Sequence, residues 1–143
     1  MCMGKNLIIS PVGQKALASE WIKGDSNFDL VLLCYENNVD VCNFFLKYTP
    51  YVYNTVGEKW HLIKSFIINN LNFIKQYSYI WFPDEDVSIT TENINNLFFQ
   101  AQNYDLWLCQ PSMTGYSSHQ ITKPVPNNIF RYTNFVEILA PLF

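Results

Sequence analysis

The chain has 143 residues, which is the usual size of a single domain. Hydrophobic residues make up 49% and charged residues 15%, so the chain can form a core and does not resemble a disordered segment. The 9 Lys and Arg residues against 12 Asp and Glu residues give a net charge of −3, without a basic run. This charge argues against general nucleic-acid binding, because a phosphate backbone attracts clustered Lys and Arg side chains.

The sequence has no pattern typical of a membrane or secreted protein. No apolar run approaches the roughly 18 residues of a membrane-spanning helix, and the amino-terminal residues lack a signal-peptide pattern. The 4 cysteines form no CxxC pair, and Cys34 and Cys109 lie inside apolar runs, where a free thiol packs as a small hydrophobe. We therefore expect a cytoplasmic protein with reduced thiols and no integral membrane segment.

The first part of the chain alternates short apolar runs with short helical patterns, which is typical of βαβ units on a mostly parallel sheet. The run at 28–35 is apolar almost throughout, as expected for a strand that is buried on both faces. In chain order, we expect a strand at 6–10, a brief helix near 17–21, a strand at 28–35, a short helix capped by Asp40, and a strand at 51–53.

The clearest helical pattern follows the third predicted strand. Apolar side chains spaced 3, 4, 4 and 3 residues apart are expected to form one buried stripe. These residues are Trp60, Ile63, Ile67, Leu71 and Ile74. A fourth strand is expected at 79–82, and Pro83 ends its ladder because proline has no N–H to donate.

The last part of the chain begins with a helix that Thr90 or Thr91 is expected to cap, with Glu92 in its first turn. Its inward face is expected to carry Ile94, Leu97, Phe98 and Ala101. A fifth strand is expected at 105–110, and the polar stretch 112–128 is expected to form a long loop of the kind that carries function. The segment 130–143 is strand-like at first and broken by Pro141.

The acidic triplet Asp84-Glu85-Asp86 directly follows the fourth predicted strand, at the end where open α/β sheets bind their ligands. In an extended segment Asp84 and Asp86 would lie on the same side, so both carboxylates could face one cation. Mg²⁺ takes one or two protein carboxylates together with substrate phosphates. The alternative is a solvated acidic turn before a helix, where carboxylates favour the positive end of the helix dipole.

Several segments of the chain resemble the GT-A glycosyltransferases. The run Tyr79-Ile80-Trp81-Phe82-Pro83-Asp84-Glu85-Asp86 looks like the strand and DxD motif of these enzymes. Other segments are similar, in the expected order, to a little-characterised group of bacterial and plant proteins that are predicted glycosyltransferases. They are Gly57-Glu58-Lys59-Trp60, Asn93-Ile94-Asn95-Asn96-Leu97-Phe98, Ser118-His119-Gln120-Ile121-Thr122 and Arg131-Tyr132-Thr133-Asn134-Phe135-Val136-Glu137. The resemblance implies a single Rossmann-like GT-A domain over residues 1–143, with a mostly parallel sheet flanked by helices.

The resemblance also implies a donor site for a nucleotide-diphosphate sugar. Asp86 would ligate Mn²⁺ or Mg²⁺, and Asp84 would contact the ribose or the metal shell; the metal would neutralise charge on the departing nucleoside diphosphate. Further donor contacts would come from Glu85, from the turn formed by Ser10, Pro11, Val12 and Gly13, and from Lys59 and Lys64 reaching a phosphate. The alternatives are an ordinary strand-ending turn and two solvated lysines.

Two residues in the last third of the chain are candidates for the acceptor side. His119 lies in the polar loop, where it either binds acceptor or pyrophosphate or is simply exposed to solvent. Glu137 lies between apolar pairs, where it either lines the acceptor side as a base or is a buried carboxylate that accepts hydrogen bonds.

Three functions are compatible with these patterns. The first is a metal-dependent glycosyltransferase that moves a sugar to a glycan or small-molecule acceptor. The second is a non-catalytic or partner-dependent nucleotide-sugar-binding module, because similar chains continue past Phe143 into a segment that supplies acceptor contacts. On this view the chain is the donor-binding half of a truncated domain, and a partner chain would complete the site. The third is a haloacid-dehalogenase-like phosphotransferase, which fits less well because its acidic motif belongs on the first strand.

Overall fold

The computed structural model describes residues 5–114 and 119–143, and it contains a four-stranded sheet. In chain order the strands are β1 (Lys5–Val12), β2 (Phe28–Cys34), β3 (Tyr51–Asn54) and β4 (Tyr77–Trp81). Their order in the sheet is β3-β2-β1-β4, and each neighbouring pair is parallel. The predicted α/β class with a parallel sheet is therefore confirmed, and the four strands expected before residue 83 are all present.

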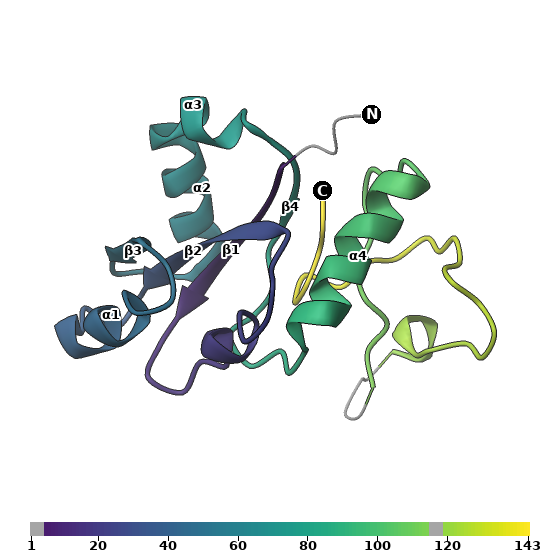
Figure 1. Ribbon diagram of the computed structural model, residues 1–143, viewed down its shortest axis with the longest axis horizontal. Helices are drawn as coiled ribbons and strands as arrows, with labels where there is room; N and C mark the ends of the chain where they lie inside the picture. The colour runs from purple at the N-terminus through teal and green to yellow at the C-terminus, as the bar shows by residue number, and fades with distance from the viewer. Residues whose placement is uncertain (1–4, 115–118) are drawn as a thin grey trace.

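Helices cover both faces of this sheet (Figure 1). One face carries the 3₁₀ helix η1 (Ala18–Glu20), α1 (Val39–Phe45) and α4 (Thr91–Asn103). The other face carries α2 (Lys59–Asn69) and the short α3 (Leu71–Ile74). Right-handed crossovers explain the positions of the helices that connect strands, because the chain moves outward from β2 to β3 and then returns past β1 to β4.

The strands at the middle of the sheet are buried on both faces. In β1, Leu7 and Ile9 pack under α2, whereas Ile8 and Val12 pack on the side of α1 and α4. Successive side chains of a strand point to opposite faces, so both sets must be apolar when both faces are covered. This explains why these strands appear in the sequence as continuous apolar runs.

Helix α4 forms as the sequence predicts. The Thr90 side chain accepts a hydrogen bond from the backbone N–H of Asn93, and this capping satisfies a donor that has no partner within the helix. Ile94, Phe98 and Ala101 are fully buried, and Leu97 packs beside them.

The helix after β3 differs from the predicted single stripe. Asn70 interrupts it and separates α2 from α3. The residues that α2 buries are Leu62, Ile63 and Phe66, whereas Trp60 and Leu71 are exposed. The prediction failed because the apolar residues of α2 surround more than one face, so spacing alone did not identify the side that meets the sheet. The predicted cap of α1 was also wrong, since Asn38 accepts the hydrogen bond from the Asp40 N–H.

The carboxyl-terminal residues extend the sheet beyond β4. Residues 139–143 run antiparallel to β4, with hydrogen bonds of 2.8 and 2.9 Å between the backbones of Ile80 and Phe143. On the other side of this segment, Leu142 exchanges backbone hydrogen bonds with Cys109. The predicted fifth strand at 105–110 and the strand-like start at 130 are therefore wrong. The segment 105–110 pairs at Cys109 alone, and residues 130–138 form no strand. Pro141 does not break the pairing, since its carbonyl accepts from the Phe82 N–H.

The thiols that the structure describes are free, and two of them belong to the core. Cys34 and Cys42 are buried, and Cys109 is half-buried. Burial, with a further contribution from Cys42, raises the pKa of Cys34 to about 12, so this thiol is a poor nucleophile at neutral pH. No helix within residues 5–114 and 119–143 is long and apolar enough to cross a membrane.

Candidate functional site

The candidate site lies at the edge of the sheet where the parallel strands end. Gly13 follows β1, Tyr35 follows β2, and the acidic triplet 84–86 follows β4. The chain leaves β1 for β2 on one side, and β4 lies on the other side, so the strand order reverses at this point. Open parallel sheets bind ligands at such a reversal, because the loops separate there and leave a crevice.

The acidic triplet was expected from the sequence to be extended, but it forms a turn. β4 ends at Trp81, and the Asp84 carbonyl accepts a hydrogen bond from the Val87 N–H at 3.2 Å. This bond closes a turn, which removes the alternation that would have placed Asp84 and Asp86 side by side. As a result, the three carboxylates have three different environments.

Asp84 is paired with a lysine. The Lys59 ammonium forms an ion pair with Asp84 and also donates to the Phe82, Ile138 and Leu139 carbonyls. The two side chains are 18% and 29% exposed, so water screens the pair only in part. Burial lowers the pKa of Lys59, and the Asp84 and Asp86 carboxylates oppose this shift. Lys59 thereby joins the start of α2 to the end of β4 and to the carboxyl-terminal segment.

Glu85 occupies the point between the ends of β1, β2 and β4. One carboxylate oxygen accepts from the Gly13 N–H at 2.5 Å, and the other accepts from the Tyr35 hydroxyl at 2.7 Å. The hydrogen bond to Glu85, with a smaller contribution from burial, raises the pKa of Tyr35 to about 12. The Glu85 carbonyl also accepts from the Leu17 N–H at 2.7 Å, so this residue is held through both its side chain and its backbone.

Gly13 lies close to the ends of two neighbouring side chains. A Cβ at this position would lie 2.7 Å from the Tyr35 hydroxyl and 2.8 Å from a Glu36 carboxylate oxygen. Both distances are shorter than ordinary van der Waals contact, so a side chain would push this cluster apart. Tyr35 was not among the candidate residues from the sequence, although its position directly after β2 placed it at the same edge.

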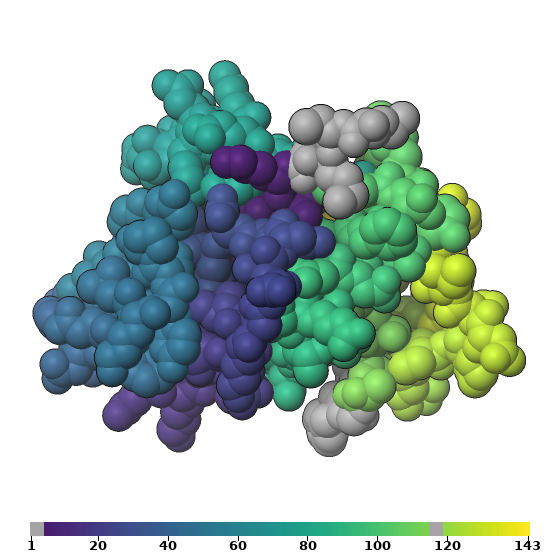
Figure 2. Space-filling view, viewed as in Figure 1, coloured from purple at the N-terminus to yellow at the C-terminus, as the bar shows by residue number. Residues whose placement is uncertain are grey.

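Asp86 is the exposed member of the triplet and lines a large crevice of about 1750 Å³. The crevice lies between α4 and the segments 105–114 and 121–136, and Figure 2 shows the surface hollowed there. Neither Asp84 nor Glu85 is among its described lining residues. Of the three carboxylates, Asp86 is therefore the one positioned to meet a ligand in this crevice.

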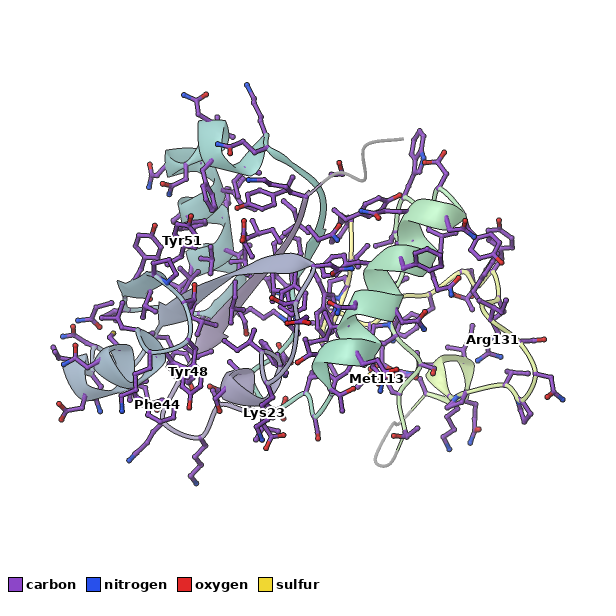
Figure 3. The ribbon with its side chains drawn as sticks, in the orientation of Figure 1. Lys23, Phe44, Tyr48, Tyr51, Met113 and Arg131 are labelled. Atoms are coloured by element: carbon purple, nitrogen blue, oxygen red, sulfur yellow. The ribbon has the colours of Figure 1, made fainter. Side chains whose placement is uncertain are left out.

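The wall of the crevice combines amide, aromatic and charged side chains. From α4 come Asn93, Asn96 and Gln100, and from the opposite wall come Trp107 and Tyr132. In Figure 3, Met113 and Arg131 lie on the segments opposite α4, and Lys23 lies near η1; all three belong to the lining. Sequence reasoning missed the α4 amides, although they make up the polar face of the helix whose apolar face it identified.

The other predicted donor residues do not line this crevice. Ser10, Pro11 and Val12 are buried in β1, and the Ser10 hydroxyl donates to the Pro83 carbonyl at 2.9 Å. Lys64 is exposed on α2 and lines a separate apolar groove of about 290 Å³ beside Phe82. Their roles in nucleotide binding stay predictions, and a contact from β1 would have to involve backbone atoms.

Glu137 and His119 also lie outside the lining of the crevice. Glu137 is buried; its carboxylate accepts from the Thr122 hydroxyl at 2.8 Å, and its N–H donates to the Gln110 side chain. This environment agrees with the alternative of a structural carboxylate. His119 is exposed, and its ring lies 4.8 Å from that of Phe135.

The acidic edge does not form a complete metal cage. Within residues 5–114 and 119–143, no group of three or more His, Cys, Asp or Glu side chains is placed to hold a metal ion. Mg²⁺ and Mn²⁺ sites that act on diphosphates need fewer protein ligands, because phosphate oxygens and water complete the coordination. Asp86 fits this second type of site, in which the cation and the diphosphate bind together.

Comparison with known proteins does not assign the chain to a family. None of the protein-family models compared with it matches, and the curated proteins compared with it give no significant match. The resemblance to GT-A glycosyltransferases therefore depends on the segments quoted above, and the parallel sheet with its two helical layers is compatible with it.

Proposed function

We propose that this chain binds a nucleotide-diphosphate sugar together with Mn²⁺ or Mg²⁺ at the carboxyl edge of its sheet, as the donor site of a GT-A-type glycosyltransferase. The observation that carries the proposal is the position of Asp86. This carboxylate lies at the reversal of strand order, is exposed, and lines a crevice of about 1750 Å³. Its two acidic neighbours are already occupied by partners within the chain.

The contacts of Asp84 and Glu85 support the proposal because they hold the turn that carries Asp86. Lys59 fixes the turn on the side of β4, and Gly13 with Tyr35 fixes it on the side of β1 and β2. A side chain that binds a cation selectively must be held in place by its surroundings. In this arrangement Asp84 and Glu85 position Asp86 and do not themselves bind the ligand.

Charge indicates that donor binding depends on a cation. Glu36, Glu85 and Asp86 gather at this edge, and Lys59 is already paired with Asp84. A bare diphosphate would meet a net negative surface there, which raises its free energy of binding. A divalent cation bound with the diphosphate removes this repulsion and would stabilise the negative charge that develops as the sugar departs.

The second candidate function is a nucleotide-sugar-binding module that does not transfer the sugar alone. Glu137, the base suggested by the sequence, is buried in hydrogen bonds and lies outside the lining of the crevice, so it is not placed to act there. The haloacid-dehalogenase-like alternative needs an accessible carboxylate nucleophile. Asp84, which would take that role, is held in its ion pair with Lys59.

Calorimetry with UDP- and GDP-sugars tests the donor site. We expect binding in the presence of Mn²⁺ that disappears with EDTA and in Asp86→Asn. Asp40→Asn is the matched control: it removes the same charge from an exposed carboxylate on α1, whose residues do not line the crevice. Absence of binding by the wild type with either metal, or binding that Asp86→Asn leaves intact, would refute the proposal. Release of nucleoside diphosphate then separates the enzyme from the binding module.

A further inference from the structure

We propose that the crevice between α4 and the segments 105–114 and 121–136 binds an uncharged oligosaccharide of several units, which would be the sugar acceptor. This inference rests on the proposed function, because it assigns the acceptor to the space that opens from Asp86. Four properties of the crevice support it: its size, its exposed aromatic side chains, its amides and its balance of charge.

The size favours an extended ligand. Pockets that hold one small molecule usually measure about 300–1,000 Å³. The crevice measures about 1750 Å³, which is more than a single sugar or a single metabolite would fill. Its lining extends from Asp86 along α4 to Gln100 and Ala101, so a ligand with one end at Asp86 can continue along the helix.

Two aromatic side chains in the lining are almost fully exposed. Trp107 is 83% exposed and Tyr132 is 86% exposed. Sugars present C–H groups on one face of the ring, and these groups are attracted to the negative face of an aromatic ring. The ring of Phe130 lies 5.6 Å from that of Tyr132 and 4.5 Å from that of Tyr104, so Tyr132 is connected to the end of α4 through Phe130.

The polar groups suit hydroxyls more than phosphates. The amides of Asn93, Asn96 and Gln100 can both donate and accept hydrogen bonds, as a sugar hydroxyl does, and Gln100 already donates to the Asn96 side-chain oxygen at 3.1 Å. Among the described lining residues, four are acidic and three are basic, so the crevice has no strong charge of one sign. A nucleic acid or another polymer with a charge on each unit would find neither a continuous basic wall nor an acidic one.

Tryptophan fluorescence can test this assignment because the four indoles differ in exposure. Trp21 and Trp81 are fully buried, and Trp60 is 38% exposed beside the separate groove on α2, so Trp107 is the indole that a ligand in the crevice would shield. We would titrate the full chain with cellotetraose, maltotetraose, mannotetraose and N-acetylchitotetraose. At least one should shift the emission to shorter wavelength, and the matching monosaccharide should bind more weakly.

Variants identify the surface that binds. Trp107→Ala and Tyr132→Ala should each weaken binding of the active tetrasaccharide roughly tenfold, the effect expected from losing one aromatic contact. Trp60→Ala is the matched control and should leave binding unchanged. Both crevice residues are so exposed that their removal should not unfold the chain, and circular dichroism checks this.

The outcomes separate this inference from the donor site. If nucleotide sugars bind and no tetrasaccharide does, the acceptor assignment fails while the proposed function stands. If a tetrasaccharide binds and nucleotide sugars do not, the crevice is a carbohydrate site and the donor site fails. Binding that survives both aromatic substitutions overturns the assignment. Self-association in sedimentation that shields Trp107 also overturns it, because the crevice would then be an interface between copies.

Discussion

Replacing Lys59 with Met removes the charge that connects three parts of the fold. Methionine keeps an unbranched apolar side chain of similar length, so packing along the start of α2 is largely preserved. The ammonium group is lost, and Asp84 and the carbonyls of Phe82, Ile138 and Leu139 lose their shared donor. The substitution therefore tests whether this single contact holds the acidic turn and the carboxyl-terminal segment against β4.

The expected loss of stability follows from the exposure of the pair. Breaking a fully buried ion pair costs about 3–5 kcal/mol, whereas an exposed pair contributes about 0–1 kcal/mol. Lys59 is 18% exposed and Asp84 29% exposed, so water compensates in part for the lost partner. We expect the free energy of unfolding to fall by about 2 kcal/mol. For a domain of this size, that corresponds to a melting temperature lower by about 6 °C.

Urea unfolding, followed through the buried indoles of Trp21 and Trp81, measures this loss. Lys64→Met is the matched control, because Lys64 is exposed on the same helix and should change stability by less than about 0.5 kcal/mol. In a double-mutant cycle with Asp84→Asn, Lys59→Met should cost clearly less than it does alone. An equal cost in both backgrounds, or a loss no larger than that of the control, would refute the assigned role of Lys59.

Three further predictions concern Gly13, Tyr35 and Leu142. Gly13→Ala should lower the free energy of unfolding by about 1–3 kcal/mol in urea, since its Cβ would lie 2.7 Å from the Tyr35 hydroxyl; an unchanged midpoint would contradict the close approach. The pKa of Tyr35 is raised from 10.0 to about 12, so its contribution is complete below pH 10 and is lost as the pH rises towards 12. Tyr35→Phe should therefore lose less stability than the wild type across that interval, and parallel pH profiles would disprove the contact with Glu85. Leu142→Ala should lower the free energy of unfolding by about 2–5 kcal/mol, because Leu142 is fully buried. Leu108, which is 49% exposed, is the control: Leu108→Ala should lower it much less when both variants are compared in thermal melts.

The sequence was sufficient to predict the four parallel strands and α4. The strands of the sheet are buried on both faces, so their apolar runs are continuous and easy to recognise. The Thr90 cap and the inward face of α4 depend on residues three or four positions apart, which is the range over which helical contacts act. The position of the acidic triplet followed from the same reasoning, because a parallel sheet presents its loops at one edge.

The roles of the three carboxylates depended on residues that are distant in the chain. Glu85 meets Gly13 from 72 positions away, and Asp84 meets Lys59 from 25 positions away. Neither contact has a periodicity that a sequence pattern could detect. The sequence placed Asp84 and Asp86 together before one cation, whereas the tertiary contacts engage Asp84 and Glu85 within the protein and leave Asp86 at the crevice.

The carboxyl-terminal part was decided by tertiary structure alone. The sequence suggested strands at 105–110 and from residue 130, but a strand forms only where a neighbour supplies hydrogen bonds along its length. The free edge of β4 supplies such hydrogen bonds, and residues 139–143 form them in place of the two predicted strands. The sequence by itself thus determined which segments could be buried and where the acidic turn lies. Pairing decided which segment completes the sheet and which of the carboxylates remains accessible, because both outcomes depend on contacts between residues far apart in the chain.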